Sequence, residues 1–198
     1  MKKIDIILSL ITGLGVGILF SWLVKNSEIN IPFLNWILPI FFPFFSLFCL
    51  WIAYSIGKKF IFVFQLAKFL LIGALFALFD LIILNGLMKW FGIAEGTKYS
   101  IFVGVSFVIA TTVKYVADKY WAFEKKEGSD IRKEFIGFFI ITLISGGIQV
   151  GIASLIVNIV GPMFGMSSLA WANVGKIGGI VVASAWNFIG YKFIVFKK

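Results

Sequence analysis

Six uninterrupted apolar stretches dominate this chain of 198 residues and restrict what it can fold into. They cover residues 4–25, 33–56, 66–90, 99–121, 135–160 and 169–196. A helix of about 20 apolar residues crosses the roughly 30 Å of bilayer hydrocarbon, so each stretch is long enough to span a membrane. A transmembrane barrel would alternate apolar and polar residues, which these stretches do not. The sequence therefore predicts an all-α, polytopic membrane protein with about six transmembrane helices.

The composition excludes several classes of function. The chain is 61% hydrophobic and 14% charged, with one cysteine and no histidine. A Cys/His zinc site, a histidine-based catalytic triad and an internal disulfide are therefore excluded. The net charge of +9 is scattered between the apolar stretches, whereas a nucleic-acid-binding protein would gather it on one face. The longest polar segment is too short for a soluble catalytic domain, so we expect no enzyme, no cofactor, no metal and no nucleic-acid partner.

Lysine and arginine are distributed unequally between the two sides of a six-helix topology. Fourteen of the eighteen lie on the side of the termini, and four lie on the other side, namely Lys25, Lys89, Lys98 and Lys176. Because cytoplasmic loops carry the excess of positive charge, we expect a multi-pass protein of the cytoplasmic (inner) membrane with both termini in the cytoplasm. Lys2 and Lys3 precede the first stretch as in a secretory signal, but its long apolar core favours a membrane anchor.

An internal repeat links the ends of the fourth and sixth stretches. Residues 114–123 align with residues 187–196, so that Lys119 matches Lys192 and Phe123 matches Phe196, 73 residues further on. A fainter echo ends the second stretch at residues 56–61, where ordinary lysine and aromatic anchors at the membrane interface explain it as well. Because each repeat spans two crossings, the copies have one orientation and form parallel two-helix repeats.

The repeated ending resembles the Asn-Phe-x-x-x-Arg/Lys-x-x-x-Phe motif of the GtrA-like family, small multi-pass membrane proteins of cell-surface polysaccharide synthesis. The second copy keeps the asparagine as Asn187, whereas the first has Lys114 in its place. The family's basic residue with phenylalanine, glycine and acidic residue of the first repeat correspond to Lys68, Phe69, Gly73 and Asp80. The resemblance covers Lys68 to Lys198. It implies a four-helix membrane domain over residues 66–198, preceded by an extra N-terminal transmembrane hairpin over residues 1–65.

The resemblance implies a function in handling polyprenyl-phosphate-linked sugars. The first hypothesis is flipping of a polyprenyl-phosphate-linked monosaccharide across the membrane for glycosylation of cell-surface polysaccharide. The alternative is a non-transporting anchor or accessory subunit for a cytoplasmic glycosyltransferase, and a third hypothesis is a cation transporter with Asp80 as its acid site. The expected partners are the sugar lipid, membrane lipids and, for the alternative, the glycosyltransferase. The sugar, the polyprenol, the direction of transport and any homo-oligomer stay open.

Ionisable side chains within the apolar stretches are candidates for the site, because lipid makes them costly unless they are paired or wetted. Asp80 lies twelve residues, or about 18 Å, beyond Lys68, and Lys176 enters from the other side. We expect these two to form a salt bridge, either in a transport path or as a structural pair. Lys114 and Asp118 share a helical face one turn apart and are expected to pair.

The complete candidate substrate-binding set is Asp80, Lys114, Tyr115, Asp118, Lys119, Trp121, Gln149, Lys176, Asn187, Tyr191 and Lys192. Its helix-end lysines would bind the phosphate, and its aromatic residues, with Tyr120, would contact the sugar. Asp80, Gln149 and Asn187 would line a polar path through the bundle. For most amides of the chain, a hydrogen-bonded link between helices is the better interpretation, but Asn187 also occupies the motif position.

Glycines cluster in the first and the sixth stretch. They include Gly13, Gly15 and Gly17 in the first and Gly175, Gly178 and Gly179 in the sixth. No strand or polar flank accompanies the first cluster, so a phosphate-binding loop is not expected there. We predict instead that these glycines let helix backbones approach closely.

Overall fold

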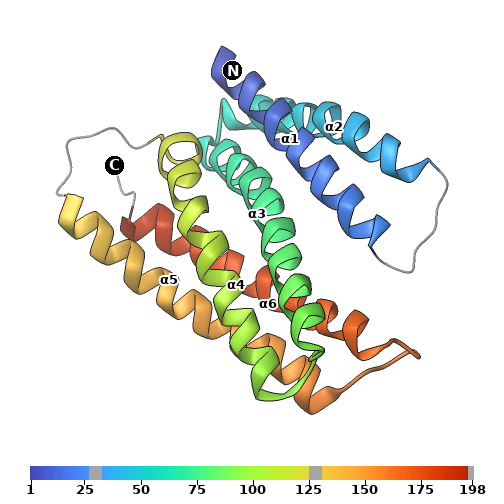
Figure 1. The fold of residues 1–198 in the computed structure, drawn as a ribbon. Helices are drawn as coiled ribbons and strands as arrows, with labels where there is room; N and C mark the ends of the chain where they lie inside the picture. Colours follow the sequence, from blue (N-terminus) through green and yellow to red (C-terminus); the bar gives the residue numbers. More distant parts are fainter. Residues whose placement is uncertain (27–32, 125–130, 196–198) are drawn as a thin grey trace. The chain divides into compact units, whose positions relative to one another are not determined.

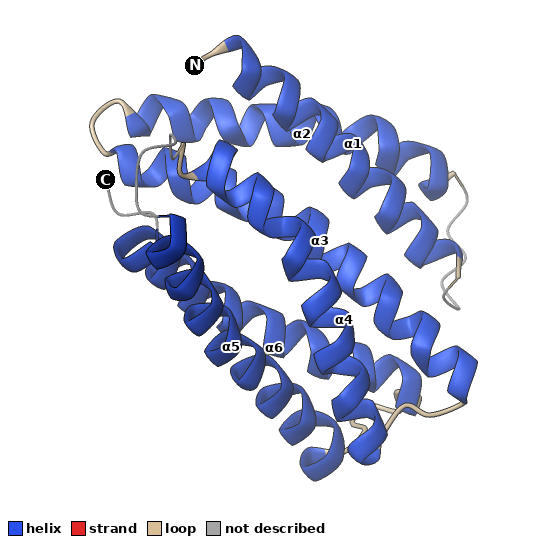
Figure 2. Cartoon of the chain, turned by 60° about the vertical axis from the view of Figure 1, so that its left-hand side comes forward, coloured by secondary structure: helices blue, strands red, loops and turns tan. Residues whose placement is uncertain are grey.

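The structure, a computed structural model, describes residues 1–26, 33–124 and 131–195, and these residues form helices without any strand (Figure 2). Six of these helices are long and apolar enough to cross a membrane. They are α1 (Lys3–Lys25), α2 (Leu34–Gly57), α3 (Ile61–Phe91), α4 (Gly96–Ala117), α5 (Ile131–Ser154) and α6 (Ser168–Gly190). Three continue into π-helical turns, η1 (Asp118–Ala122), η2 (Leu155–Val160) and η3 (Tyr191–Val195). The predicted all-α, polytopic architecture is confirmed.

The chain forms two compact units, each described here by itself. The first comprises Met1–Phe79 and Lys114–Glu124, and the second comprises Asp80–Val113 and Lys125–Lys198. The first unit thus holds α1, α2, residues 61–79 of α3, the end of α4 and η1. The second holds the rest of α3, most of α4, and α5 and α6 with their π-helical turns. The expected division into an N-terminal hairpin and a four-helix domain at residue 65 stays a prediction.

In the first unit, α1 and α2 lie side by side and pack through glycine (Figure 1). A Cβ atom on Gly13 would collide with Ser46 Oγ, and one on Gly17 would lie 2.5 Å from the carbonyl oxygen of Leu38. Ser46 Oγ also donates a hydrogen bond to the carbonyl of Ser9 at 2.7 Å. The glycines of α1 therefore allow the close backbone approach that the sequence predicted.

Two prolines interrupt the hydrogen-bond ladder of α2, at Pro39 and Pro43. Pro39 has no N–H, so the carbonyl of Asn35, four residues earlier, loses its helical donor. The hydroxyl of Ser21 on α1 donates to that carbonyl at 2.9 Å. Since lipid offers no replacement donor, the packing of α1 on α2 satisfies a polar group that would otherwise be costly.

In the second unit, the turn between α3 and α4 and the turn between α5 and α6 are built alike. The first turns through Gly92 and Gly96, with φ angles of 66° and 74°, and the second through Gly161 and Gly165, with φ angles of 74° and 71°. Corresponding glycines are 69 residues apart (161 − 92 and 165 − 96). Glycine adopts this left-handed conformation without steric cost. The repeat therefore extends from the helix ends to the turns.

Residues related by the repeat also contact one another in this unit. Tyr99 Oη donates a hydrogen bond to the carbonyl of Ala172, 73 residues further on, at 2.8 Å. Lys176 Nζ donates to the carbonyl of Val103, again across 73 residues, at 3.2 Å. Within this unit, α4 and α6 therefore contact each other through residues at equivalent positions of the repeat.

Candidate functional site

An ion pair between Asp80 and Lys176 lies in the interior of the second unit. Lys176 Nζ is 2.8 Å from Asp80 Oδ1, and the two side chains are only 0% and 4% exposed. Lys176 also donates to Ser106 Oγ at 3.0 Å and to the carbonyl of Val103, while Gln149 Nε2 donates to Asp80 Oδ2 at 3.0 Å. The expected salt bridge is therefore present, and three predicted residues meet in one polar cluster.

The charges of this ion pair are not repeated at the equivalent positions of the other hairpin. Gln149 stands 69 residues after Asp80, the spacing of the glycine turns, and Lys176 stands 73 residues after Val103. Each charged residue therefore has a neutral counterpart in the other hairpin. Because a charge in lipid is retained only when it is paired or wetted, the two hairpins depend on each other at this point.

In the first unit, the end of α4 carries the predicted pair of Lys114 and Asp118. Lys114 Nζ lies 2.5 Å from Asp118 Oδ2 and 4.1 Å from the centre of the Phe69 ring. Asp118 is fully buried, and its Oδ1 atom has no hydrogen-bond partner among the described residues. Lys119 follows in η1 and is 8% exposed, with its Nζ 5.9 Å from the ring of Tyr115. Such π-helical turns often occur at functional sites.

In the second unit, the end of α6 carries the other copy of the motif. Asn187 is buried, and its Oδ1 atom lacks a hydrogen-bond partner within the described part of the chain. Tyr191 shares a hydrogen bond of 2.9 Å with the hydroxyl of Thr142. Lys192 lies in η3, which begins 73 residues after η1, so the two motif copies also share a backbone irregularity. Phe196, the last motif residue, lies outside the described residues.

The predicted site residues thus form three groups, each within one unit. The first unit holds Lys114, Tyr115, Asp118, Lys119 and Trp121. The second unit holds Asp80, Gln149 and Lys176 at its centre and Asn187, Tyr191 and Lys192 at the end of α6. Their roles in binding a substrate stay predictions.

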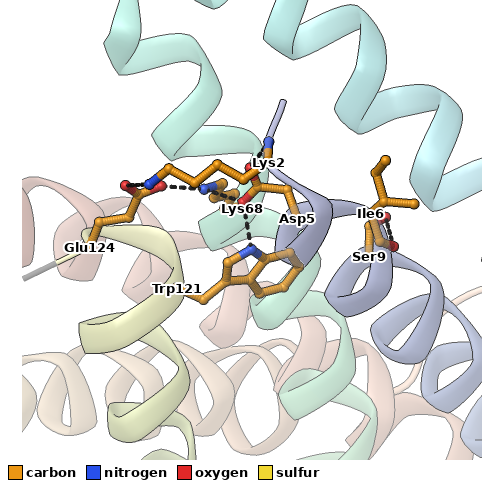
Figure 3. Close-up of polar contacts among 7 residues, drawn as sticks. All are labelled: Lys2, Asp5, Ile6, Ser9, Lys68, Trp121 and Glu124. Atoms are coloured by element: carbon orange, nitrogen blue, oxygen red, sulfur yellow. Dashed lines mark hydrogen bonds and ion pairs between the residues drawn. The ribbon is translucent and has the colours of Figure 1, made fainter.

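The sequence did not predict the polar contacts at the beginning of α1, here called the Lys68 cluster, which comprises Lys2, Asp5, Lys68, Trp121 and Glu124 (Figure 3). Lys68 Nζ lies 2.6 Å from Asp5 Oδ1 and 2.7 Å from Glu124 Oε1. Trp121 Nε1 donates to the same Asp5 oxygen at 3.2 Å, and Lys2 Nζ lies 2.5 Å from Glu124 Oε2. Trp121, predicted to contact a sugar, here has an internal partner.

Charge in the Lys68 cluster is balanced, because two lysines face two carboxylates. Burial alone would raise the pKa of Glu124, but hydrogen bonds from Lys2 and Lys68 and their positive charges lower it to about 2. The hydrogen bond and negative charge of Glu124 in turn raise the pKa of Lys2. One feature of the sequence could have indicated this cluster. Asp5 is an acidic residue inside an apolar stretch, and such a residue needs a partner.

Six helices of the described residues that are long and apolar enough to cross a membrane, two similar hairpins and a buried ion pair define a small multi-pass membrane protein with an internal repeat. The chain belongs to the GtrA/DPMS transmembrane-domain family, whose model matches residues 68–196. This match confirms the resemblance seen in the motifs and associates the protein with polysaccharide and glycolipid synthesis. Searches of curated proteins and of solved structures found no significant match.

Proposed function

We propose that the protein flips polyprenyl-phosphate-linked monosaccharides across the membrane for glycosylation of cell-surface polysaccharide. The observation that supports this most is the buried cluster of Asp80, Gln149 and Lys176 within the family-matched helices. Ionisable groups at such positions commonly mark a substrate path. In this proposal, the hydroxyl groups of a sugar replace the hydrogen bonds that these residues make to one another. In this proposal the protein moves its substrate without changing it chemically.

The motif ends of α4 and α6 are proposed to receive the polar head of this lipid. Lys119 and Lys192 offer positive charge for the phosphate. Asp118 and Asn187 each have a buried oxygen without a hydrogen-bond partner among the described residues, and a sugar hydroxyl is a donor that fits such an acceptor. Each copy of the motif therefore combines a cation with an acceptor.

The proposal is tested with purified protein in vesicles that contain a fluorescent polyprenyl phosphate monosaccharide, by measuring its transfer between leaflets. The double variant Asp80→Gln with Lys176→Val replaces both charges by the residues of their own repeat counterparts. We expect it to fold and to flip the lipid at least about tenfold more slowly than the wild type. A well-folded double variant that flips at the wild-type rate would remove the ion pair from the path.

The helix-end lysines are tested in the same assay. Lys119→Ala and Lys192→Ala should each slow flipping, because each removes a charge from one copy of the motif. Lys59→Ala is the matched control, since Lys59 is an exposed lysine beyond the end of α2 with an aromatic neighbour, Phe60. Equal behaviour of all three variants would make these lysines ordinary interfacial anchors.

A non-transporting anchor for a cytoplasmic glycosyltransferase is the competing proposal. The assay separates the two, because an anchor moves no lipid even as the wild-type protein. An anchor would also tolerate neutral residues at Asp80 and Lys176 and still be isolated together with a glycosyltransferase from cells.

We also propose that both termini lie in the cytoplasm, from the fourteen-to-four division of lysine and arginine. Ser167, exposed at the N-cap of α6, would then face outward. Ser167→Cys in a Cys49→Ser background should react in intact cells with a membrane-impermeant maleimide. Reaction only after lysis would reverse the topology.

A further inference from the structure

Two donors of the Lys68 cluster converge on a single oxygen atom. Lys68 Nζ lies 2.6 Å from Asp5 Oδ1, and Trp121 Nε1 lies 3.2 Å from the same atom (Figure 3). All three residues are buried, with exposed fractions of 1% for Lys68, 1% for Asp5 and 6% for Trp121. A buried cation and an N–H group aimed at one point form a binding site for an anionic oxygen.

The donors and the acceptor of this site come from different parts of the sequence. Lys68 and Trp121 belong to the segment that the family model matches, residues 68–196. Asp5 belongs to α1, which lies outside that segment. The family domain therefore supplies an anion site, and the additional N-terminal helix supplies the anion that fills it.

The two oxygens of Asp5 have separate tasks. Oδ2 accepts a hydrogen bond from the backbone N–H of Lys2 at 3.0 Å and so stabilises the first turn of α1. Oδ1 alone contacts the two donors of the site. Another anion could therefore replace Oδ1 while the cap of α1 stays intact, and exchange of one anion for another would keep the charge of this buried region balanced.

We propose that Lys68 and Trp121 form a phosphate-binding site that Asp5 occupies in the absence of ligand, so that α1 competes with the phosphate group of a lipid. This inference rests on the proposed function for the identity of the lipid. The chain before Lys68 supports a lipid ligand, because it presents exposed apolar side chains, namely Phe60 and, at the start of α3, Ile61 and Phe62.

The test measures binding of farnesyl phosphate, farnesol and inorganic phosphate to the full-length protein in detergent by calorimetry. Asp5→Asn keeps an oxygen for the cap of α1 but removes the competing charge. We expect it to bind farnesyl phosphate at least about tenfold more tightly than the wild type does, with farnesol unchanged. Adding Lys68→Gln to Asp5→Asn should abolish this gain.

Glu124→Gln is the matched control, because it removes the other carboxylate of Lys68 without emptying the position that Trp121 also contacts. It should tighten binding much less than Asp5→Asn does. An equal gain for both variants would overturn the proposal, since it would reflect net charge alone. A gain for farnesyl phosphate but not inorganic phosphate assigns the site to a lipid, and a gain for both assigns it to the phosphate group from either source.

A measurement on the wild-type protein covers the case in which Asp5→Asn does not fold. Farnesyl phosphate should increase hydrogen–deuterium exchange in residues 3–9, because the start of α1 then loses its tertiary contacts with Lys68 and Trp121 although it keeps its own cap. Farnesol should leave the exchange unchanged. Unchanged exchange at saturating farnesyl phosphate would overturn the proposal. Its failure differs from that of the proposed function: tighter binding by Asp5→Asn without any flipping leaves the site standing, and flipping without any effect of Asp5→Asn leaves transport standing.

Discussion

The α3–α4 and α5–α6 hairpins have similar backbone turns but carry different charges at equivalent positions. Both turn through left-handed glycines at equivalent positions. At their centre, the α3–α4 hairpin contributes Asp80 and the α5–α6 hairpin contributes Lys176, while the counterparts of these residues are the neutral Gln149 and Val103. The helices therefore pack with neutral side chains at the positions equivalent to Asp80 and Lys176. The ion pair is therefore an addition to the repeat and not a requirement of its backbone.

The same comparison holds for weaker contacts of the two hairpins. Asn85 donates to Asn173 at 2.8 Å, and their repeat counterparts, Ser154 and Ser100, share a hydrogen bond of 2.6 Å. The position of the bond is kept although both side chains differ. Hydrogen bonds between the hairpins therefore recur at equivalent positions of the repeat, although the side chains that form them differ.

Removing one charge of the Asp80–Lys176 ion pair should have the largest effect on stability. Lys176→Met leaves the buried carboxylate of Asp80 without its cation and should lower the free energy of unfolding by about 3–5 kcal/mol. Denaturant unfolding in detergent micelles measures this change. Making both sides neutral, by Asp80→Gln with Lys176→Val, should recover stability to within about 1 kcal/mol of the wild type. A double variant as unstable as the single one would contradict the view that the helices accept neutral residues here.

Filling a glycine position of one hairpin should have the next largest effect. A Cβ atom on Gly179 would lie 2.6 Å from the carbonyl oxygen of Gln149, whereas the counterpart of Gly179 in the other hairpin is Ser106, which has a side chain. Gly179→Ala should therefore cost about 1–3 kcal/mol of stability through overpacking. Gly147→Ala is the control, because a Cβ atom there meets nothing within 4 Å. It should match or exceed the wild type in thermal stability.

The ends of the hairpins differ in their response to pH. Lys68 forms an ion pair with Glu124. The repeat counterpart of Lys68, 69 residues further on, is Gly137, which carries no charge. The pKa of Glu124 is lowered from its ordinary value of 4.5 to about 2 in the folded protein. The ionised carboxylate therefore contributes fully to folding stability above about pH 4.5, and this contribution is lost as the pH falls toward about 2. Because Glu124 is partly exposed, this contribution is on the order of 1 kcal/mol.

Thermal unfolding of the wild type and of Glu124→Gln across this pH range checks the prediction. The two melting curves should differ above about pH 4.5 and converge as the pH approaches about 2. A difference that stays constant down to the lowest pH would show that the carboxylate is not held in its charged form by the two lysines.

The smallest effect on stability is expected from the hydrogen bonds that recur in both hairpins, between Ser100 and Ser154 and between Asn85 and Asn173. Ser154→Ala removes the bond to Ser100 and should cost about 0.6 kcal/mol, the usual size for one hydrogen bond between membrane helices. Ser55→Ala is the control, because Ser55 is exposed and bonds only the carbonyl of Trp51 in its own helix. A loss above about 2 kcal/mol for Ser154→Ala would show that these bonds hold the hairpins together more strongly than their geometry indicates.

Much of the fold could be predicted because the bilayer restricts it so strongly. Each span needs a fixed length of apolar residues, and all six were found from that requirement alone. The pairing of Lys114 with Asp118 followed from helical periodicity, and that of Asp80 with Lys176 from the cost of charge in lipid. These are local or energetic arguments, which need no knowledge of how distant segments pack.

Contacts that depend on distant packing could not be predicted. Lys68 and Glu124 are 56 residues apart, and nothing in their spacing brings them to Asp5. The repeat between α3 and α5 was missed because counterparts such as Asp80 and Gln149 differ in type. It is visible instead in the similar positive φ angles of the glycine turns and in the contact between the equivalent residues Asp80 and Gln149.

The order in which the chain is made gives the central ion pair a consequence for biogenesis. A ribosome synthesises Asp80 almost a hundred residues before Lys176, so the carboxylate has no cation while α4 and α5 emerge. An unpaired carboxylate in lipid is unfavourable, which disfavours release of α3 from the insertion machinery until α6 arrives. Asp80 therefore reaches its paired state only after α6 is made, and a nascent chain that stops before α6 leaves this carboxylate without its cation.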